Sequence, residues 1–521
     1  MTFRQASWDE PLIHELDNGR RGLTFVGLVE EFKQLMGELN IPPSIRREEP
    51  PQLPEVSEVE VIRHYTRLSE MSYGVDNGPV PLGSCTMKYN PKIALKYAFD
   101  ERLQLMHPLE PEDRYQGVLR ALYELQQWLA TIVGMDFCSL GISAGAQGEL
   151  AGVLTIKRYH ELKGQTDLKT EIIVPDSAHG TNPASAAMAG FKVVEIPTAE
   201  DGNMDYEAFR AALGPRTAGL MLTNPSTLGL FEERILRIAD DVHAVDGLLY
   251  YDGANLNGII GRARPGDMGF DIAHLNLHKT FSTPHGGGGP GAGPVCVKDR
   301  EVINGVRLKD LVPGSFVYYD EKSGLYRLAY RGPASRGSLS HFLGNLPQLI
   351  WSYVYILSLG PQGLREVSEV SVINTNYFLA RVLGETKGFS LPYAKGRPRK
   401  HEAVISASPL AEKYGVTAED VSKALLDAGF YAPTIYFPLI VKEALMVEFT
   451  ESETKENIDK YVERLKEIEQ LAASDPGKLK ASPLNTSSQR VDAVRASHPR
   501  TVTPTYRVER ARRSGKELVL R

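Results

Sequence analysis

Cysteine is scarce in this 521-residue sequence, and long hydrophobic runs are absent. The three cysteines, Cys85, Cys138 and Cys296, form an odd set without C-x-x-C spacing, which indicates neither a disulfide framework nor a zinc site. No apolar run approaches the ~18 residues of a membrane-spanning helix, and residues 1–17 are acidic where a signal peptide would be basic and then hydrophobic. We therefore expect a cytoplasmic protein without a membrane segment.

Charge of one sign is not in large excess either. The sequence has 59 Lys and Arg, 65 Asp and Glu, and a formal net charge of −6, which gives no sign of a nucleic-acid-binding surface. Residues 474–521 are the exception, because this C-terminal tail contains 11 basic and 4 acidic residues. A basic tail of this kind is typical of a disordered segment.

The order of apolar runs along the chain predicts its domains. Residues 1–75 contain the Pro-rich string IPPSIRREEPPQLPE and no sustained alternation, which predicts an N-terminal arm that lies on another surface. Residues 76–375 contain an apolar stripe at helical spacing over 118–132 and then alternate helical stretches with the runs FCSLG, EIIVPD, KVVEIP, AGLMLTN, LLYYD and IAHLNLH. This alternation predicts a large α/β domain whose mainly parallel sheet has helices on both faces.

A smaller pattern of strands and helices follows in residues 376–473, which predicts a compact α+β C-terminal domain. Thr417 with Asp420, and Thr450 with Glu453, have the spacing of helix starts, and Gly429 suits a helix end.

One lysine, Lys279, lies between the apolar run IAHLNLH and a glycine-rich turn. A lone loop lysine is more often an ordinary surface residue. A lysine at the end of a buried strand, however, loses hydration, and desolvation favours the neutral amine that condenses with an aldehyde. Lys279 is therefore a candidate Schiff-base anchor for pyridoxal phosphate, a cofactor that also needs a carboxylate for its ring nitrogen, a phosphate site and a group stacked on its ring.

Candidates for these three further groups precede Lys279 in the sequence. Asp252 ends the apolar run LLYYD, so it would be a buried carboxylate that requires a cation such as a pyridinium, although a turn aspartate before glycine is equally common. His179 follows the run EIIVPD and is the ring-stacking candidate, against the ordinary reading of a structural loop histidine. The phosphate candidate is the turn Ala144, Gly145, Ala146 and Gln147 before a helical pattern, where backbone N–H groups can approach an anion.

Several long strings resemble one enzyme family. The strings are LGSCTMKYNP, DSAHGTNPASA, TNPSTLGLFE, DGANLNGI and RPGDMGFDIAHLNLHKTFSTPHGGGGPG. Together they resemble the P-protein of the glycine cleavage system, the decarboxylating glycine dehydrogenase. The opening EPLIHELDNGRRG resembles the start of subunit 2 of the two-subunit form, so the resemblance runs from about residue 10 to about residue 470.

The resemblance implies a fold of the aspartate-aminotransferase type, pyridoxal phosphate as cofactor, glycine as substrate and CO2 as product. Carried over by motif, Lys279 becomes the Schiff-base lysine, Asp252 the partner of the pyridine nitrogen, and His179 the ring-stacking residue. Asn255 and His278 lie in the matching strings and are added as cofactor-binding residues. Ser84 and Thr86, in LGSCTMKYNP, are added as glycine-contacting candidates.

The resemblance also implies partners. The aminomethyl group would pass to the lipoyl arm of the H-protein. Because the fused form of the family is about twice as long and only its C-terminal half keeps the lysine, this chain is predicted to be the catalytic subunit of a heterotetramer, with two copies each of subunits 1 and 2. Arg-rich C-terminal strings in the family favour a basic tail that wraps a partner subunit.

Other motifs in the same residues fit the sequence context less well. Gly141-Ile-Ser143-Ala-Gly145 spells the nucleophile elbow of a serine hydrolase, with Asp252 and His278 or His285 in the right order, but the sequence before Ser143 reads mostly as arm and helix rather than strand. Residues 286–291 match a dinucleotide-binding fingerprint, but prolines disfavour the helix that should follow it. We therefore interpret this string as a turn that permits close backbone approach.

His274 and His278 lack a third ligand, so we predict no metal. A non-catalytic subunit is the third alternative.

All three cysteines are predicted to have structural roles. Cys138 and Cys296 lie in apolar runs and are predicted to be small core residues. The Cys85 thiol lies in a polar loop that the resemblance places near the active site, yet reactivity needs a lowered pKa, so a structural role is favoured.

Overall fold

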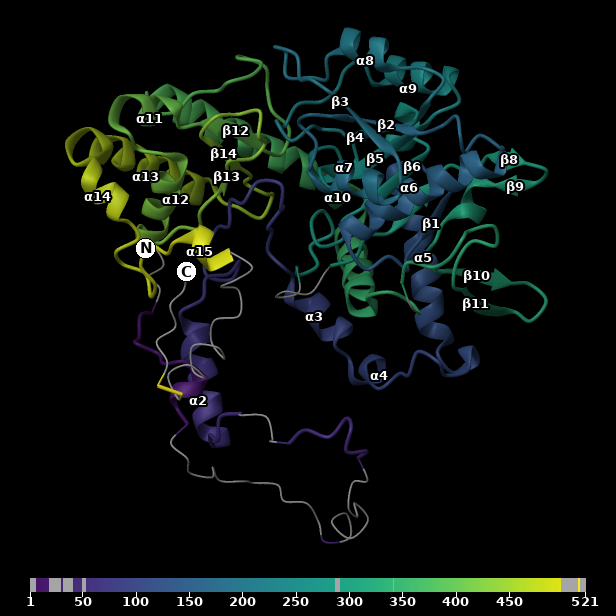
Figure 1. The fold of residues 1–521 in the computed structure, drawn as a ribbon, viewed down its shortest axis with the longest axis horizontal. Helices are drawn as coiled ribbons and strands as arrows, with labels where there is room; N and C mark the ends of the chain where they lie inside the picture. The colour runs from purple at the N-terminus through teal and green to yellow at the C-terminus, as the bar shows by residue number, and fades with distance from the viewer. Residues whose placement is uncertain are drawn as a thin grey trace. The chain divides into compact units, whose positions relative to one another are not determined.

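A computed structural model describes residues 6–17, 30, 41–48, 53–285, 291–340, 342–497 and 514–515. The chain divides into two compact units (Figure 1). The larger unit consists of Val75–Leu425 and Phe430–Lys480, and the smaller one of Met1–Gly74, Leu426–Gly429 and Ala481–Arg521. Among the described residues, no helix combines the length and the apolar composition that crossing a membrane requires.

A seven-stranded sheet forms the centre of the larger unit, with the strand order β1-β7-β6-β5-β4-β2-β3. The contacts β3–β2, β2–β4, β4–β5 and β5–β6 are parallel, whereas β7 runs antiparallel to both β6 and β1. The predicted mainly parallel sheet is confirmed, and each of the six predicted apolar runs supplies a strand. The strands are β1 (Phe137–Ser139), β2 (Glu171–Pro175), β3 (Lys192–Ile196), β4 (Thr217–Thr223), β5 (Leu248–Gly253), β6 (Ile272–Leu275) and β7 (Val295–Val297).

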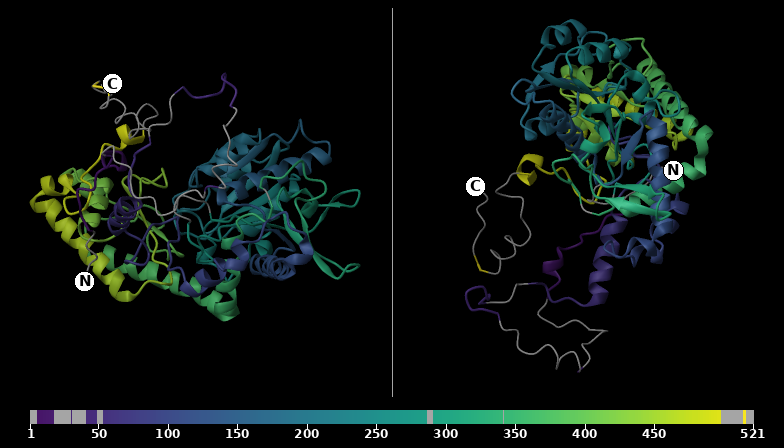
Figure 2. Two further views of the ribbon diagram at one scale, coloured as in Figure 1. Left: turned by 90° about the horizontal axis from the view of Figure 1, so that it is seen from below. Right: turned by 90° about the vertical axis from the view of Figure 1, so that its right-hand side faces the viewer.

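Helices cover both faces of this sheet, as the sequence predicts. Successive side chains of a strand point to opposite faces, and in β5 Leu249 and Tyr251 pack into one hydrophobic cluster while Leu248 and Tyr250 pack into another. The views in Figure 2 show helices on either side of the strands. The first cluster includes residues of α5 (Gln116–Val133), α8 (Tyr206–Ala212) and α9 (Ile235–Ala244), and the second those of α6 (Gly145–Leu162) and α7 (Thr181–Met188).

Helix α5 contains the apolar stripe predicted over 118–132. Leu122, Leu125 and Leu129 are buried in the core. The helix ends before Gly134, whose φ of 70° is the left-handed conformation that glycine adopts without steric cost.

The C-terminal part of the larger unit contains a three-stranded antiparallel sheet with the order β12-β14-β13. The predicted start at Thr417 is confirmed, because the Asp420 N–H donates to Thr417 Oγ1 over 3.3 Å and the Thr417 N–H donates back to Asp420 Oδ2 over 2.9 Å. The predicted start at Thr450 is wrong, since Thr454 caps the next helix. These elements are β12 (Ala403–Ser406), β13 (Thr434–Ile435), β14 (Ala444–Val447), α11 (Ser408–Tyr414), α12 (Ala418–Asp427) and α13 (Lys455–Ser474).

Helix α10 (Leu346–Glu385) leads from the large sheet toward the small one. It bends at Gly360, whose φ of 62° lies outside the helical range and which precedes Pro361. The predicted boundary between residues 375 and 376 falls within this helix and stays a prediction. The remaining elements of the unit are α3 (Lys92–Ala98), α4 (Glu101–Gln104), β8 (Glu301–Ile303), β9 (Val306–Arg307), β10 (Phe316–Asp320), β11 (Leu325–Ala329) and α14 (Pro476–Ala481).

The smaller unit contains helices α2 (Glu58–Glu70) and α15 (Ala493–Ser497). Ser57 and Glu60 form a reciprocal capping box at the start of α2. The Glu10 carboxylate pairs with Arg67 and with His64, whose Nδ1 lies 2.7 Å from Glu10 Oε1. For the basic tail, residues 498–513 and 516–521 lie outside the described residues.

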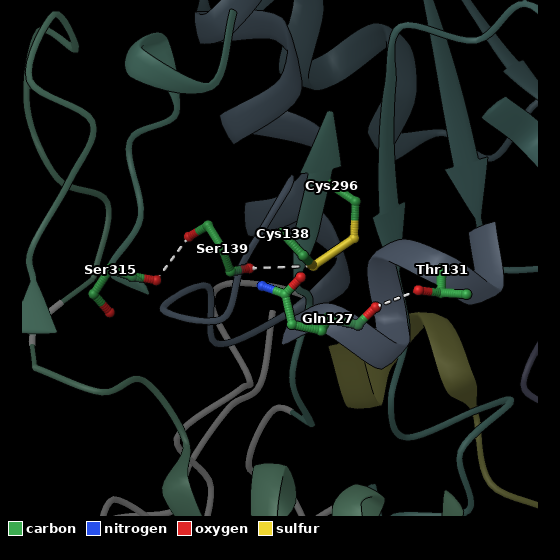
Figure 3. Close-up of a disulfide and its surroundings, with 6 residues drawn as sticks. All are labelled: Gln127, Thr131, Cys138, Ser139, Cys296 and Ser315. Atoms are coloured by element: carbon green, nitrogen blue, oxygen red, sulfur yellow. Dashed lines mark hydrogen bonds between the residues drawn. A yellow bond between two sulfur atoms is a disulfide. The ribbon is translucent and has the colours of Figure 1, made fainter. Parts of the chain in front are cut away.

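A disulfide joins Cys138 of β1 to Cys296 of β7 (Figure 3). The two residues are direct partners in the antiparallel ladder, and their Cα atoms lie 3.9 Å apart. The expectation of no disulfide is therefore wrong, although both residues are buried in the core as predicted. The cysteines are 158 positions apart and no local spacing marks them, because the sheet order alone makes them neighbours.

Removal of this disulfide is expected to lower stability. A cross-link over 158 residues restricts the unfolded chain, and disulfides of this kind typically contribute about 2–4 kcal/mol to the free energy of unfolding. The Cys138→Ala/Cys296→Ala double variant should therefore unfold at a lower denaturant concentration and lose its response to dithiothreitol. Cys85→Ala, which removes the free thiol, is the control and should respond to reductant like the native chain. Equal denaturation midpoints for the double variant and the oxidised native chain would contradict the prediction.

Candidate active site

A cavity of about 140 Å³ lies at the C-terminal ends of the parallel strands. In open α/β sheets this edge is where ligands bind. The loops after β4, β5 and β6 and the starts of α6 and α7 supply most of its walls. The lining residues are Ser84, Gly145, Ala146, Glu149, His179, Thr181, Thr223, Thr227, Asp252, Ala254, Asn255, Asn276, His278 and Lys279. The structure thus brings together most of the predicted site residues, but Ala144, Gln147 and Thr86 do not line the cavity.

Lys279 reaches the cavity from the turn that follows β6. Its backbone N–H donates to the Asn276 carbonyl over 3.0 Å, which closes this turn directly after the strand. The side chain is half-buried, and the following residues Thr280 and Phe281 are fully buried. The Lys279 amine therefore reaches the cavity from a turn whose following residues are buried.

Asp252, at the end of β5, is 1% exposed, and its carboxylate accepts hydrogen bonds from several donors. Asn182 Nδ2 donates to Oδ2 over 3.0 Å, and the Ala254 N–H donates to Oδ1 over 3.0 Å. Thr223 Oγ1 also donates to Oδ2, over 3.2 Å. Burial alone would raise the pKa of Asp252, but His274, these donors and Lys279 outweigh it and lower the pKa below its usual value. A buried anion therefore faces the cavity.

His274 lies behind Asp252, with Nε2 3.5 Å from Asp252 Oδ1 and Nδ1 2.5 Å from the Tyr250 hydroxyl. Burial lowers the pKa of His274, whereas the charge of Asp252 opposes this shift. The Asp252 carboxylate also lines the cavity, where it can meet a cationic group. One carboxylate oxygen of Glu149, one of Asp252 and one ring nitrogen of His274 all lie within 4.8 Å of one another.

Glu149, in the first turns of α6, lines the cavity but was missed in the sequence analysis. It is 5% exposed, and burial followed by the charge of Asp252 raises its pKa to about 8. At neutral pH it is therefore a neutral acid that can donate a hydrogen bond. The small residues of α6 could have signalled it, because Gly148 and Gly152 let this helix face lie against His274 and Tyr250.

The turn at residues 144–147 forms the start of α6, as predicted for a phosphate site. Ala144 is the N-cap residue, and Gln147 turns its Oε1 back to accept the Ser143 N–H over 3.0 Å. Gly145 and Ala146 face the cavity. The first N–H groups of a helix have no partner within the helix, and the helix dipole favours an anion there.

Gly293 fixes the position of this turn. A Cβ on Gly293 would lie 2.1 Å from the Ala144 carbonyl oxygen, so only glycine fits. In the same stretch, a Cβ on Gly291 would lie 2.1 Å from His278 Nδ1. The close backbone approach predicted for the glycine-rich string is thus present at its end, whereas residues 286–290 of the proposed fingerprint lie outside the described residues.

Gly293→Ala is expected to weaken the binding of a phosphate-bearing ligand. The added methyl group must displace backbone atoms of the turn, and we expect a dissociation constant for pyridoxal phosphate at least about tenfold higher, the effect of losing one or two hydrogen bonds to a charged group. An absorbance titration measures this constant. Gly214→Ala is the matched control, because no atom of the described residues lies within 4 Å of the position that its Cβ would occupy. Unchanged affinity in Gly293→Ala would show that the turn does not bind the phosphate.

Two further predicted histidines line the cavity. The His179 side chain is exposed, and its Nδ1 lies 2.8 Å from Thr181 Oγ1 while its ring contacts Phe437 edge-on at 5.7 Å. The His278 ring lies 5.0 Å from the ring of His285, and burial together with His285 lowers the pKa of His278 to about 3. His278 is therefore neutral at pH 7. The exposed ring of His179 can stack on a flat ligand.

The LGSCTMKYNP segment meets the cavity through Ser84, while Thr86 is buried to one side. Asn255 lines the cavity too, but its Nδ2 is engaged by the Pro225 carbonyl at 3.0 Å and by Glu402 Oε1 at 2.9 Å. Burial raises the pKa of Cys85, which disfavours the thiolate.

The serine-hydrolase reading lacks its geometry. Ser143 does not line the cavity, and no hydrogen bond joins it to a histidine in the part of the chain that the structure describes. The preceding strand, β1, is an edge strand with an antiparallel neighbour, whereas a nucleophile elbow lies at the top of the hydrolase sheet.

Comparison with known proteins identifies the family. The family model "Glycine cleavage system P-protein" matches residues 13–328, and the model "Glycine dehydrogenase, C-terminal domain" matches residues 367–485. The chain belongs to the glycine cleavage system P-protein family. A probable glycine dehydrogenase (decarboxylating) subunit 2 of Staphylothermus marinus is 64% identical over 97% of this chain and 98% of its own. The protein of the same description from Aeropyrum pernix is 64% identical over 99% of both chains.

Solved structures agree on the fold of this P-protein family member. An inhibitor-bound glycine decarboxylase (P-protein) of the glycine cleavage system superposes with a TM-score of 0.70 over 86% of this chain and 100% of its own, at 21% sequence identity. A Burkholderia pseudomallei sphingosine-1-phosphate lyase superposes with a TM-score of 0.58 over 86% of this chain and 97% of its own, at 16% identity. The predicted pyridoxal-phosphate transferase fold, with its large sheet and smaller C-terminal domain, is confirmed.

Proposed function

We propose that this chain is the catalytic subunit of a pyridoxal-phosphate-dependent glycine dehydrogenase that decarboxylates glycine. The observation that carries the proposal is the placement of Lys279 and the buried, ionised Asp252 in one cavity with the start of helix α6. The description shared by its 64% identical relatives supports the reaction.

The residues of the cavity fit pyridoxal phosphate. The ionised Asp252 matches a protonated ring nitrogen, and the backbone N–H groups of Gly145 and Ala146 match a phosphate. Three buried atoms of lining residues, Glu149 Oε2, Asn276 Oδ1 and His278 Nδ1, have no hydrogen-bond partner among the described residues. Buried polar atoms are rarely left unsatisfied, so these atoms favour a polar ligand in the cavity.

Each cavity residue would then have a distinct task. Bound pyridoxal phosphate supplies an electron sink for the electron pair that remains when CO2 leaves. Lys279 would hold the aldehyde carbon through its amine and release it when glycine binds. Asp252 would keep the ring nitrogen protonated, and the neutral Glu149 would donate a hydrogen bond without adding charge. His179 would cover the ring face and limit the access of water.

The same proposal includes partners. The aminomethyl group would pass to the lipoyl arm of an H-protein, and Ser84 with Thr86 would belong to the segment that meets glycine. The relatives are described as subunit 2, which supports a subunit 1 partner. The proposed assembly contains two copies of each subunit. Asn255 and His278 would support the cofactor from the loops after β5 and β6.

The test is release of labelled CO2 from carboxyl-labelled glycine by the full chain with pyridoxal phosphate, lipoylated H-protein and subunit 1. Release that depends on all components supports the proposal. A chain that takes up no pyridoxal phosphate, or that instead reacts with a fluorophosphonate at Ser143, would overturn it in favour of the hydrolase. Full activity of the chain without subunit 1 would remove the partner from the proposal.

A further inference from the structure

Two acidic residues of the small sheet, Glu402 and Glu448, lie next to the segment that carries Ser84. Glu402 precedes β12 and Glu448 follows β14, and because Ala403 pairs with Val447 in the antiparallel ladder, the two glutamates occupy the next facing positions. Their side chains are 0% and 1% exposed, and their carboxyl groups approach to within 4.8 Å. They therefore form a buried carboxyl pair.

This pair holds the Ser84 loop, residues 82–86, through its backbone. Glu402 Oε2 accepts the Ser84 N–H over 2.7 Å, and Glu448 Oε2 accepts the Thr86 N–H over 3.0 Å. Ser84 and Thr86 have φ angles of 68° and 46°, a left-handed conformation that is unfavourable for residues with a side chain. Such a conformation persists only where surrounding contacts enforce it, and here the two carboxyl groups supply those contacts.

Glu402 has a second contact that connects the loop to the large sheet. Its Oε1 accepts Asn255 Nδ2 over 2.9 Å, so one carboxyl group ties together two residues that line the cavity, Ser84 and Asn255. Glu448 differs, because its Oε1 has no partner among the described residues. The two members of the pair are therefore unequal in their hydrogen bonding.

No ion pair neutralises the pair in the described part of the chain. The cations that face it are Lys279, in the cavity, and Lys88. Lys88 Nζ is already engaged by other acceptors, Asn257 Oδ1 at 2.8 Å, the Thr280 carbonyl at 3.0 Å and Glu451 Oε1 at 2.7 Å. The other facing groups carry no charge at neutral pH, because burial lowers the pKa of His401 to about 3 and raises that of the Cys85 thiol.

Two buried carboxyl groups this close cannot both ionise at low cost. Burial raises the pKa of Glu402, and burial together with the charge of Glu402 raises the pKa of Glu448 well above its usual range. The pair therefore keeps a proton at neutral pH.

We propose that Glu402 is a positioning residue that holds Ser84 at the cavity to meet the carboxylate of glycine, and that the Glu402–Glu448 pair must carry no more than one negative charge for glycine to bind. The inference rests on the proposed function, because it takes glycine as the substrate. A second charge on the pair would repel the substrate carboxylate and would also leave the loop beside two anions. The protonation state of the Glu402–Glu448 pair, in the small sheet, thus affects the affinity for glycine.

Because Glu402 and Glu448 make different hydrogen bonds, substituting each of them tests a different part of the proposal. In Glu448→Gln, the amide oxygen can still accept the Thr86 N–H, so this variant imitates the protonated pair. In Glu402→Gln, one oxygen cannot accept from both Ser84 and Asn255, so one contact is lost. Glu232→Gln is the matched control, because Glu232 is a 5% exposed carboxyl that accepts the Arg234 N–H and does not line the cavity.

Glycine kinetics of the complete system are measured from pH 6.5 to 9. At pH 6.5 we expect for Glu402→Gln a KM for glycine about tenfold higher than the native value, with kcat changed less than about twofold, as for the loss of a hydrogen bond that only binds substrate. For the native chain and the control, KM should rise with pH, whereas for Glu448→Gln it should stay low. A native KM in Glu402→Gln, or a native rise of KM with pH in Glu448→Gln, would overturn the proposal.

Thermal unfolding supplies a readout that needs no activity. A carboxyl group whose pKa is raised by folding keeps a proton that the unfolded chain releases above about pH 4.3, so its contribution to stability falls as the pH rises toward the folded pKa. The Tm of Glu448→Gln relative to the native chain should therefore increase between pH 5.5 and pH 8, and a constant difference would contradict the shared proton. If the native chain releases no CO2 from glycine, the proposed function fails, while this Tm comparison still decides whether the pair shares a proton.

Discussion

Replacement of Lys279 by alanine is expected to abolish glycine decarboxylation. Lys279 supplies the only amine among the described residues that line the cavity, so without it the cofactor cannot be held covalently. We expect the loss of the absorbance band that arises when pyridoxal phosphate is bound to a lysine, and a fall in turnover of at least about a thousandfold, since removal of a covalent catalyst leaves only binding and electrostatic contributions. The two measurements are an absorbance spectrum and the release of labelled CO2.

A buried lysine elsewhere in the same unit supplies the control. Lys169 is 4% exposed and its Nζ donates to the Thr217 carbonyl over 3.0 Å, at the start of β4 and away from the cavity. Lys169→Met should keep the absorbance band, and borohydride reduction should still attach a pyridoxyl group to Lys279. A pyridoxyl group found on another lysine of the native chain would contradict the role of Lys279.

The large sheet could be predicted because most of its strands are buried on both faces. Such strands read as short apolar runs, and all six predicted runs became strands. Strand β7 was missed, since its three residues follow the glycine-rich stretch and pair with antiparallel neighbours outside the alternating pattern. The same strand contains Cys296, so the missed strand and the missed disulfide have one cause.

The site could be predicted where a residue lies at the end of a strand or in the turn after it. Asp252 lies near the end of β5 and Lys279 in the turn after β6, and parallel strands place such residues at one edge of the sheet. Residues whose orientation depends on packing were not found. Glu149 faces the cavity because two glycines bring α6 close to the sheet, and Asn276 does so because the Lys279 turn begins at it.

Local sequence signals also failed where two similar signals stand close together. Thr450 and Glu453 have the spacing of a helix start, but the helix begins four residues later, with Thr454 accepting the Asn457 N–H. Thr86 is a comparable case, since it shares a motif with Ser84 but turns away from the cavity into the contact with Glu448. Both residues have left-handed φ angles, which no sequence pattern displays.

Replacement of Asp252 by asparagine is expected to cut turnover by at least about a hundredfold, the cost of removing one electrostatic group that stabilises developing charge. Asparagine keeps the size of the side chain and one acceptor oxygen, so the contacts with Asn182 and Ala254 can be partly retained while the charge is lost. The ring nitrogen would then lose its proton, and with it the capacity to accept the electron pair. Labelled CO2 release and bound-cofactor content measure the two effects separately.

Asp271→Asn distinguishes this effect from the loss of any buried carboxylate. Asp271 is 3% exposed, accepts the Leu249 N–H over 2.8 Å and lies at the opposite end of β6 from the cavity. Its replacement should lower the Tm with little effect on kcat. Because the pKa of Asp252 is already lowered in the folded chain, its charge persists from pH 5 to pH 9, and the deficit of Asp252→Asn should be the same across this range. A deficit that disappears at low pH would mean that the charge of Asp252 does not keep the ring nitrogen protonated.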